Sequence, residues 1–448
     1  MSDGSLGRRA IVIGGSIAGL MSAKLLSNRY KSVVVIDKDT LDVFPENRKM
    51  VPQSHHVHIV LKAGEEGLNQ IFPGFSEDML ALGSVRIDMS QEMVSCSALG
   101  VAPKWKSDIS LLSQSRPLLE HALYRRVRKE CPNVEFRNST SVSGLSYDSG
   151  LNRVTGVNLK NRDSKDDQIS SDIIVDASGR GALALRWFKD LGLPAPELDE
   201  VKVLVGYASC RVRLCEDNTR KWKGVECGGP APDHHIAGML MPIENGLHIC
   251  SVTSRFSDFP PTSENDFVEY LTRFPHPFFS KALEGAEIVS PIQKMRYESS
   301  KRRRYEALEN LPKGYMPIGD ALCSVNPCYG QGMSSAVLQA KVLGSVLAAI
   351  NSNEALDEIP GRFLNQAEPV CNQIWRNACL KDFRYPKTAG SRAFISEKEI
   401  EEQVLLERAS ILNPKLRLQL MRLSHLLDDP SLLDSDEFRS LIDVPCPV

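Results

Sequence analysis

The stretch from residue 10 to residue 37 constrains the fold of this chain more than any other. It starts with AIVIGGSIAG, so a fully apolar strand over 11–13 runs into a glycine-rich turn. An amphipathic helix over 17–27 follows, and then a second apolar run over 33–36. Strand, glycine turn, helix and strand in this order predict a βαβ unit that binds a dinucleotide at the N-terminus of its helix.

The glycines of this motif have separate roles. Gly14 permits the tight turn after the strand, and Gly19 lets the helix pack against that strand. Asp37 follows Gly14 by about twenty residues, where a carboxylate takes the ribose hydroxyls. Ser16 replaces the usual middle glycine, and its hydroxyl offers a contact to a phosphate. The residues predicted to bind the nucleotide here are Gly14, Gly15, Ser16, Ala18, Gly19, Asp37 and Lys38.

A second glycine-rich stretch lies much later, over 315–340. A short apolar run ends in Gly319 and Asp320, and NPCYGQGM then leads into a long helical pattern. An acid at a strand end, a glycine loop and a helix start together suit a polar, partly anionic ligand. Asp320 would accept a hydrogen bond from it, although an acid there also fits a cap. The binding residues predicted here are Gly319, Asp320, Pro327, Gly330, Gly332 and Met333.

Two further segments carry candidate ligand residues. Arg48 is a cation suited to the phosphates or the ring of a cofactor. The apolar run 173–175 ends in DASGRG, so Asp176 and Gly179 mark another strand end that brings backbone close to a ligand. The three histidines over 55–58 have no companion cysteine or histidine cluster at ligand spacing, and we predict no metal site.

Composition limits the class of protein. The 448 residues carry a formal net charge of −2, which gives no electrostatic reason to expect nucleic acid as a partner. We expect no transmembrane segment and no secretory signal, since no window has the required apolar length. The eleven cysteines are scattered without a CxxC pair, so free thiols in the cytoplasm are expected. The one basic block, 301–304, is predicted to be a solvated turn or helix start.

The remaining chain shows two further patterns. Alternating strands over 201–254 predict a mixed or antiparallel sheet. Chamber residues for a substrate would come from the strands around 200–300. After residue 356 the pattern is mostly helical and predicts a C-terminal layer that closes over a site. Between the first two glycine motifs, a helix is predicted from residue 57 to residue 71.

Three motifs follow one another in this order: GGSIAG with Asp37, DASGRG, and IGDALCSVNPCYGQGM. Together they resemble the motifs of the group A flavin monooxygenases, which are FAD-dependent monooxygenases with the para-hydroxybenzoate hydroxylase fold. Further segments, among them RKMVPQSHHVHIVLKAGEEGLNQIFPGF and RWFKDLGLPAPE, are similar to polyether-type alkene epoxidases. The likeness covers residues 8 to about 345. The Trp-x-Trp-x-Ile-Pro signature of the related halogenases is absent from the sequence.

The resemblance implies an α/β fold. A Rossmann-like FAD-binding domain of the glutathione-reductase type would combine with a substrate domain built on a mixed or antiparallel sheet, under a C-terminal helical layer. The implied boundaries are 1–75, 112–190 and 300–350 for the FAD-binding domain, 76–111 and 191–299 for the substrate-binding domain, and 351–448 for the helical region.

The resemblance also assigns roles within the FAD site. GGSIAG would hold the ADP half of FAD, and Asp320 the ribityl chain. Arg48 and Arg116 would lie beside FAD, and the loop over 327–332 near the isoalloxazine ring. The DASGRG strand end differs from the Asp-Gly of many relatives, where the motif also helps with the nicotinamide donor. NADPH, NADH and a separate flavin reductase are therefore all retained as hydride sources.

The implied activity is monooxygenation in secondary metabolism. FAD reduced by NAD(P)H would react with O2 to a C4a-hydroperoxide that epoxidises or hydroxylates an apolar small molecule, such as an isoprenoid or polyketide alkene. No residue is predicted to be catalytic, because the cofactor supplies the chemistry. Tyr207, His248 and Tyr329 are candidate chamber residues, although each also fits ordinary packing. The alternatives are an FAD-dependent reductase of the geranylgeranyl-reductase kind and a non-catalytic flavin-binding protein. Neither the substrate nor the oligomeric state follows from the sequence.

Overall fold

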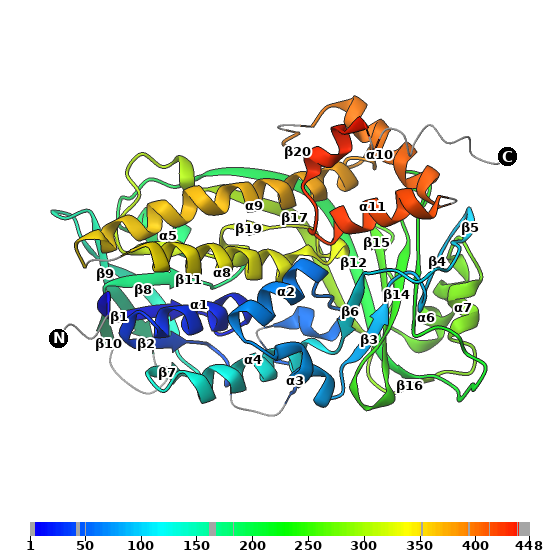
Figure 1. The fold of residues 1–448 in the computed structure, drawn as a ribbon, viewed down its shortest axis with the longest axis horizontal. Helices are drawn as coiled ribbons and strands as arrows, with labels where there is room; N and C mark the ends of the chain where they lie inside the picture. The colour runs from blue at the N-terminus through cyan, green and yellow to red at the C-terminus, as the bar shows by residue number, and fades with distance from the viewer. Residues whose placement is uncertain are drawn as a thin grey trace.

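The computed structural model describes residues 5–41, 45–49, 51–160, 167–181, 183–350, 353–392, 395–411, 413–436 and 438. Two lobes lie side by side along the longest axis (Figure 1). One lobe contains a parallel sheet with long helices, and the other contains a large, mostly antiparallel sheet. Helices α10 (Glu397–Ser410) and α11 (Pro414–Ser424) lie over the second lobe. This arrangement confirms the predicted fold class.

A five-stranded parallel sheet forms the centre of the N-terminal lobe. Its strands, in spatial order, are β18 (Tyr315–Pro317), β11 (Ile173–Asp176), β1 (Gly7–Ile13), β2 (Tyr30–Ile36) and β7 (Val134–Arg137). The central strands are buried on both faces, which explains their continuous apolar sequence. The packed helices are α1 (Ile17–Ser27), α2 (Lys62–Ile71), α3 (Phe75–Ala81), α4 (Arg116–Glu130), α5 (Ala184–Asp190) and α8 (Gln331–Ala349).

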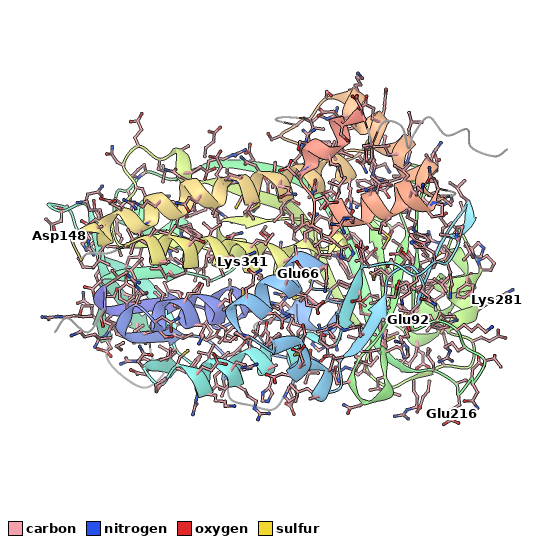
Figure 2. All side chains as sticks on the ribbon, viewed as in Figure 1. Glu66, Glu92, Asp148, Glu216, Lys281 and Lys341 are labelled. Atoms are coloured by element: carbon pink, nitrogen blue, oxygen red, sulfur yellow. The ribbon has the colours of Figure 1, made fainter. Side chains whose placement is uncertain are left out.

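A small antiparallel sheet accompanies the parallel one. It consists of β8 (Ser141–Asp148), β9 (Arg153–Lys160) and β10 (Asp167–Ser170). A two-stranded sheet pairs β3 (Val85–Asp88) with β6 (Ser110–Ser113). Charged side chains such as Asp148, Glu216 and Lys281 project from the outside of the molecule (Figure 2).

The second lobe is a ten-stranded sheet. Its main path runs through β19 (Cys323–Ser324), β17 (Gln293–Arg304), β12 (Glu197–Arg213), β15 (His248–Arg255), β14 (Ala237–Pro242), β13 (Gly224–Cys227), β4 (Met93–Ser97) and β5 (Gly100–Val101). The short strands β16 (Glu287–Ile288) and β20 (Ala389–Gly390) also pair with β12. Helices α6 (Glu264–Tyr270) and α7 (Phe278–Ala282) pack at the far end of this lobe (Figure 1).

Two local predictions were wrong. The basic block over 301–304 is part of β17, and Arg302 and Arg303 are 0% and 3% exposed, so it is no solvated turn. Burial is possible because Arg302 pairs with Glu306 at 2.5 Å and Arg303 donates to backbone carbonyls. Helix α2 begins at residue 62, since residues 57–61 are extended and contain branched side chains that line cavities.

Among the described residues, the α-helices of the C-terminal layer are α9 (Ile359–Asp382), α10 (Glu397–Ser410) and α11 (Pro414–Ser424). Helix α9 packs along α8, and α10 and α11 pack against each other near the sheet of the second lobe (Figure 1). Among the described helices, α8 has the length and apolar composition of a membrane span, which the sequence prediction did not foresee. It packs against α1, α2 and α9, as the core helix of a globular domain does.

Candidate cofactor site

A cavity of about 580 Å³ lies where the strands of the parallel sheet end. We call it the motif cavity, because its wall includes the turn after β1, the end of β2 and the loop after β18. A parallel sheet binds ligands at this carboxyl edge. The predicted ligand residues in its wall are Gly14, Ser16, Ala18, Asp37, Lys38, Arg48, Arg116, Gly179, Gly319, Asp320, Pro327, Gly330, Gly332 and Met333.

Three predicted ligand residues lie outside this wall. A Cβ on Gly19 would come 1.8 Å from the carbonyl oxygen of Gly14, so Gly19 serves the packing of α1 on β1. The backbone N–H of Gly15 donates to Asp37 Oδ2 at 2.6 Å and orders the turn. Asp176 is fully buried and accepts from the Tyr315 hydroxyl at 2.8 Å, so its carboxylate holds the strand end together.

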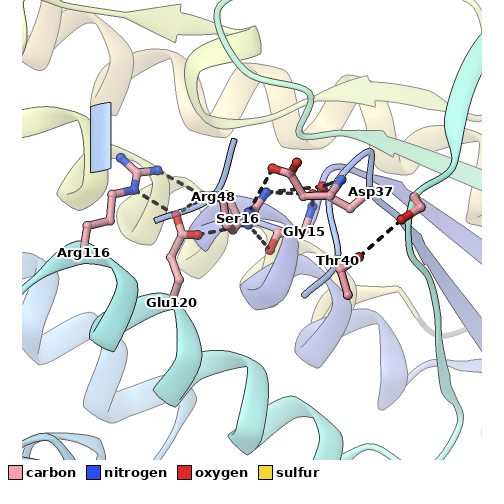
Figure 3. A network of polar contacts seen from close by, with 9 residues as sticks. Gly15, Ser16, Asp37, Thr40, Arg48, Arg116 and Glu120 are labelled. Carbon is pink, nitrogen blue, oxygen red and sulfur yellow. Dashed lines mark hydrogen bonds and ion pairs between the residues drawn. The ribbon is translucent and has the colours of Figure 1, made fainter. Parts of the chain in front are cut away.

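A network of charges spans the nucleotide end of the motif cavity (Figure 3). Arg48 donates to Asp37 at 3.1 Å and to Glu120 at 3.0 Å. Arg116 donates to the same Glu120 at 2.8 Å and to the Ser16 hydroxyl at 3.0 Å. Ser16 in turn donates to Glu120 at 2.7 Å. Glu120 thus accepts hydrogen bonds from Ser16, the serine that replaces glycine, and from Arg48 and Arg116. These bonds keep both arginines beside the N-terminus of α1.

Glu120 is a positioning residue that the sequence interpretation missed. Although burial raises the pKa of this carboxyl, Arg116 and Arg48 lower it below the usual value. The carboxylate is therefore charged at neutral pH, and it keeps both arginines ordered in the absence of an anion. Its signal in the sequence was the spacing of four residues from Arg116, which places both side chains on one face of a helix.

Glu120→Gln should lower the free energy of unfolding at pH 7 by about 3 kcal/mol, because it removes the carboxylate that pairs with buried Arg116 and one of the carboxylates that pair with Arg48. Urea unfolding at several pH values measures this. The folded-state pKa is lowered, so the stabilisation by Glu120 is present above the unfolded pKa and is lost as pH falls through the folded pKa. The difference between wild type and variant should thus shrink below about pH 4.

The exposed Glu135, which pairs with Arg137, is the control for this change. Glu135→Gln should alter stability by less than about 0.5 kcal/mol at every pH. A Glu120→Gln protein as stable as the Glu135→Gln protein at pH 7 would contradict the positioning role.

The other end of the motif cavity contains Asp320. Its carboxylate accepts no hydrogen bond from any described residue, and burial raises its pKa while Arg116, Arg180 and Arg303 oppose the shift. An acceptor left unsatisfied at a cavity wall is suited to a ligand hydroxyl. Arg303 supports this end from behind, donating to the carbonyls of Asp320 and Ala321 at 3.2 Å each and of Arg180 at 3.0 Å.

The chain fits FAD at this site. The loop before α8 turns at Gly330, whose φ of +65° favours glycine, and the first N–H groups of α8 follow directly. Because Gly330 and Gly332 both line the cavity, side chains there would hold a flat ring away from the helix N-terminus. The helix dipole at that end suits negative charge on a reduced flavin.

A second cavity of about 610 Å³ adjoins the motif cavity, and we call it the chamber. The residues that line both are Val57, Ile59, Tyr207, Pro327 and Gly330. Of the candidate chamber residues, Tyr207 and Tyr329 line the chamber, whereas His248 does not. The sequence interpretation had placed the chamber residues in the strands around 200–300. Much of the chamber wall comes instead from helices α9, α10 and α11.

These features suit a flavin in the motif cavity, with the chamber adjoining it. Residues 8–378 match the model of the FAD binding domain family. The chain belongs to this family of group A flavin monooxygenases with the para-hydroxybenzoate hydroxylase fold, and its cofactor is FAD. It is an oxidoreductase, and NAD(P)H is the usual hydride donor of its class.

Individual relatives are known from sequence and structure. The chain is 31% identical to Protein Rv3254 of Mycobacterium tuberculosis over 352 residues, which cover 77% of this chain and 73% of that protein. The flavin-dependent brominase Bmp2 has a similar fold, with a TM-score of 0.65 at 18% identity over 98% of both chains. PqsL of P. aeruginosa, in complex with 2-aminobenzoylacetate, gives 0.64 at 15% identity over 85% of this chain and 97% of its own.

Proposed function

We propose that this flavoprotein uses NAD(P)H and O2 to insert one oxygen atom into a small organic molecule, by epoxidation or hydroxylation. The observation that carries the proposal is the contact between chamber and motif cavity at Val57, Ile59 and Tyr207. A molecule in the chamber would meet the ring end of FAD directly. Bound FAD would supply the chemistry that activates O2, and the chain would supply position and exclusion of water.

Epoxidation is favoured over phenol hydroxylation by the residues at this junction. A phenol is activated by a base that removes its proton, whereas an alkene needs no base. Burial lowers the pKa of His56 to about 4 and raises the pKa of Tyr207 well above its usual range. Both are neutral at physiological pH and poor bases there. The apolar part of the chamber, which includes Met89, Leu111 and Met239, suits an isoprenoid or polyketide chain.

We also propose that the predicted residues in the wall of the motif cavity bind FAD in the roles given above, and that the domain boundaries are as predicted. The cytoplasm is the proposed location, since all ten described cysteines are free.

The test is product analysis by mass spectrometry, with purified protein, FAD and NADPH under ¹⁸O2, on a panel of polyenes and phenols. One ¹⁸O atom should appear in an epoxide product, and no product should form under argon. A reduced product without ¹⁸O would favour a reductase of the geranylgeranyl-reductase kind, and product formation under argon would rule out oxygen insertion from O2.

A further inference from the structure

The part of the chamber formed by the C-terminal helices is charged, which a purely apolar substrate does not explain. The charged side chains in this part of the wall are Arg376, Lys381, Arg384, Glu407, Arg408 and Arg417. Arg255, from β15, faces the same space. Burying charge is costly unless each group has a partner, so the pairing of each cation is informative.

Most of these cations are paired within the chain. Arg384 forms an ion pair with Glu407, and Arg376 with Glu399. Arg255 lies 2.9 Å from Asp382 and donates to the Tyr329 hydroxyl at 2.8 Å. Arg408 lies near the surface with Asp233 at 3.7 Å, and Arg417 contacts Glu226 at 4.0 Å. Each of these guanidinium groups therefore has a carboxylate.

Lys381 differs from them. Its Nζ forms no ion pair and no hydrogen bond with any described residue, and it lies 5.2 Å from the centre of the Tyr329 ring. Burial lowers the pKa of this ammonium group and nearby Arg384 adds to the effect, while Glu407 opposes it. Glu407 is already paired with Arg384, so Lys381 has no carboxylate of its own among the described residues.

His425 provides a second donor on the same wall. Its Nδ1 accepts a hydrogen bond from the backbone N–H of Lys62 at 3.3 Å, so the neutral ring carries its hydrogen on Nε2. Burial, together with the charges of Lys381 and Lys62, lowers the pKa of His425 to about 4, which keeps the ring neutral. Lys381 and His425 both line the chamber, and the charge of Lys381 acts on the His425 ring. An ammonium and an N–H donor on one wall suit an anionic oxygen pair.

We propose that Lys381 and His425 bind a carboxylate of the substrate, so that the natural substrate is an apolar molecule that ends in a carboxylate rather than a neutral alkene. This inference rests on the proposed function in one respect, because it takes the chamber to be the substrate site. Tyr329 lies in the loop 327–330, which borders both cavities. A carboxylate held beside Tyr329 would leave the apolar remainder to extend toward Val57 and Ile59 at the junction.

The test compares two probes of the same shape, biphenyl-4-carboxylate and biphenyl-4-ylmethanol, by titration calorimetry on the FAD-loaded protein. The carboxylate should bind wild type roughly tenfold or more tightly than the alcohol, because a charge-assisted hydrogen bond holds it. Lys381→Met should remove this preference and leave the affinity for the alcohol within about twofold. Lys381→Arg keeps the charge and should retain most of the preference.

The matched control is Lys398→Met, which removes the same charge from an exposed position on α10 with 83% of the side chain accessible. It should leave both affinities unchanged. Flavin absorbance and circular dichroism establish that each variant is folded and loaded with FAD. The carboxylate site is overturned if wild type binds the carboxylate no more tightly than the alcohol, or if Lys381→Met retains the preference.

Calorimetry on the loaded protein detects binding and requires no turnover. A chamber that prefers the carboxylate, in a protein that incorporates no ¹⁸O, would refute the monooxygenase proposal and leave the carboxylate site standing. Incorporation of ¹⁸O without any preference for the carboxylate would refute only the site at Lys381 and His425.

Discussion

Asp320→Ala should weaken FAD binding at least tenfold, since a hydrogen bond between a ligand hydroxyl and a charged acceptor contributes about 1.5–3 kcal/mol. The flavin-free protein should respond in the opposite direction. The Asp320 carboxylate is unpaired among the described residues and burial raises its pKa, so its charge destabilises the empty protein at neutral pH. Flavin retention after dialysis and thermal unfolding of the flavin-free protein measure the two effects.

Weaker FAD binding together with a more stable flavin-free protein would distinguish a ligand role of Asp320 from a structural role. A helix or loop cap at Asp320 would give a flavin-free variant less stable than wild type. The control is Asp217→Ala, which loses only the bonds that Thr219 donates in an exposed turn. It should leave FAD retention unchanged and lower the thermal stability of the flavin-free protein only slightly. If Asp320→Ala protein retains FAD through dialysis as well as wild type does, the placement of the ribityl chain is wrong.

Arg303→Met should have the largest effect on stability, about 3–4 kcal/mol, together with loss of FAD. The substitution leaves the carbonyls of Asp320, Ala321 and Arg180 without their donor in a buried setting. Two of these residues belong to the loop after β18, and the third belongs to the strand end after β11. Both loops line the motif cavity, so loosening them should weaken the cofactor site. Urea unfolding and the ratio of flavin to protein absorbance measure both outcomes.

Lys301, two residues earlier in β17, is a matched control because 39% of its side chain is exposed and its only described ion pair is with Glu200 at 3.6 Å. Lys301→Met should cost less than about 1 kcal/mol. Equal effects of the two substitutions would show that the basic block acts through its general charge rather than through the bonds of Arg303.

The fold class was predictable because it is encoded by local patterns. The continuous apolar run over 11–13, the glycine turn and the acid after β2 define a βαβ unit without reference to distant residues. The helix boundary near residue 57 was wrong for the opposite reason. Residues 57–61 stay extended because their side chains fill the junction of two cavities, a demand that comes from elements elsewhere in the chain.

The same contrast applies to the candidate site. The sequence by itself predicted two ligand motifs, a nucleotide motif near residue 14 and an acid with a glycine loop near residue 320, because each motif needs only its own backbone turn. The tertiary structure alone decided that Arg48 joins Glu120 and that Arg303 holds Arg180, and it left Lys381 without an ion pair among the described residues at a chamber wall. Charge pairing depends on which distant groups folding brings within a few ångströms, and no spacing along the chain encodes that distance.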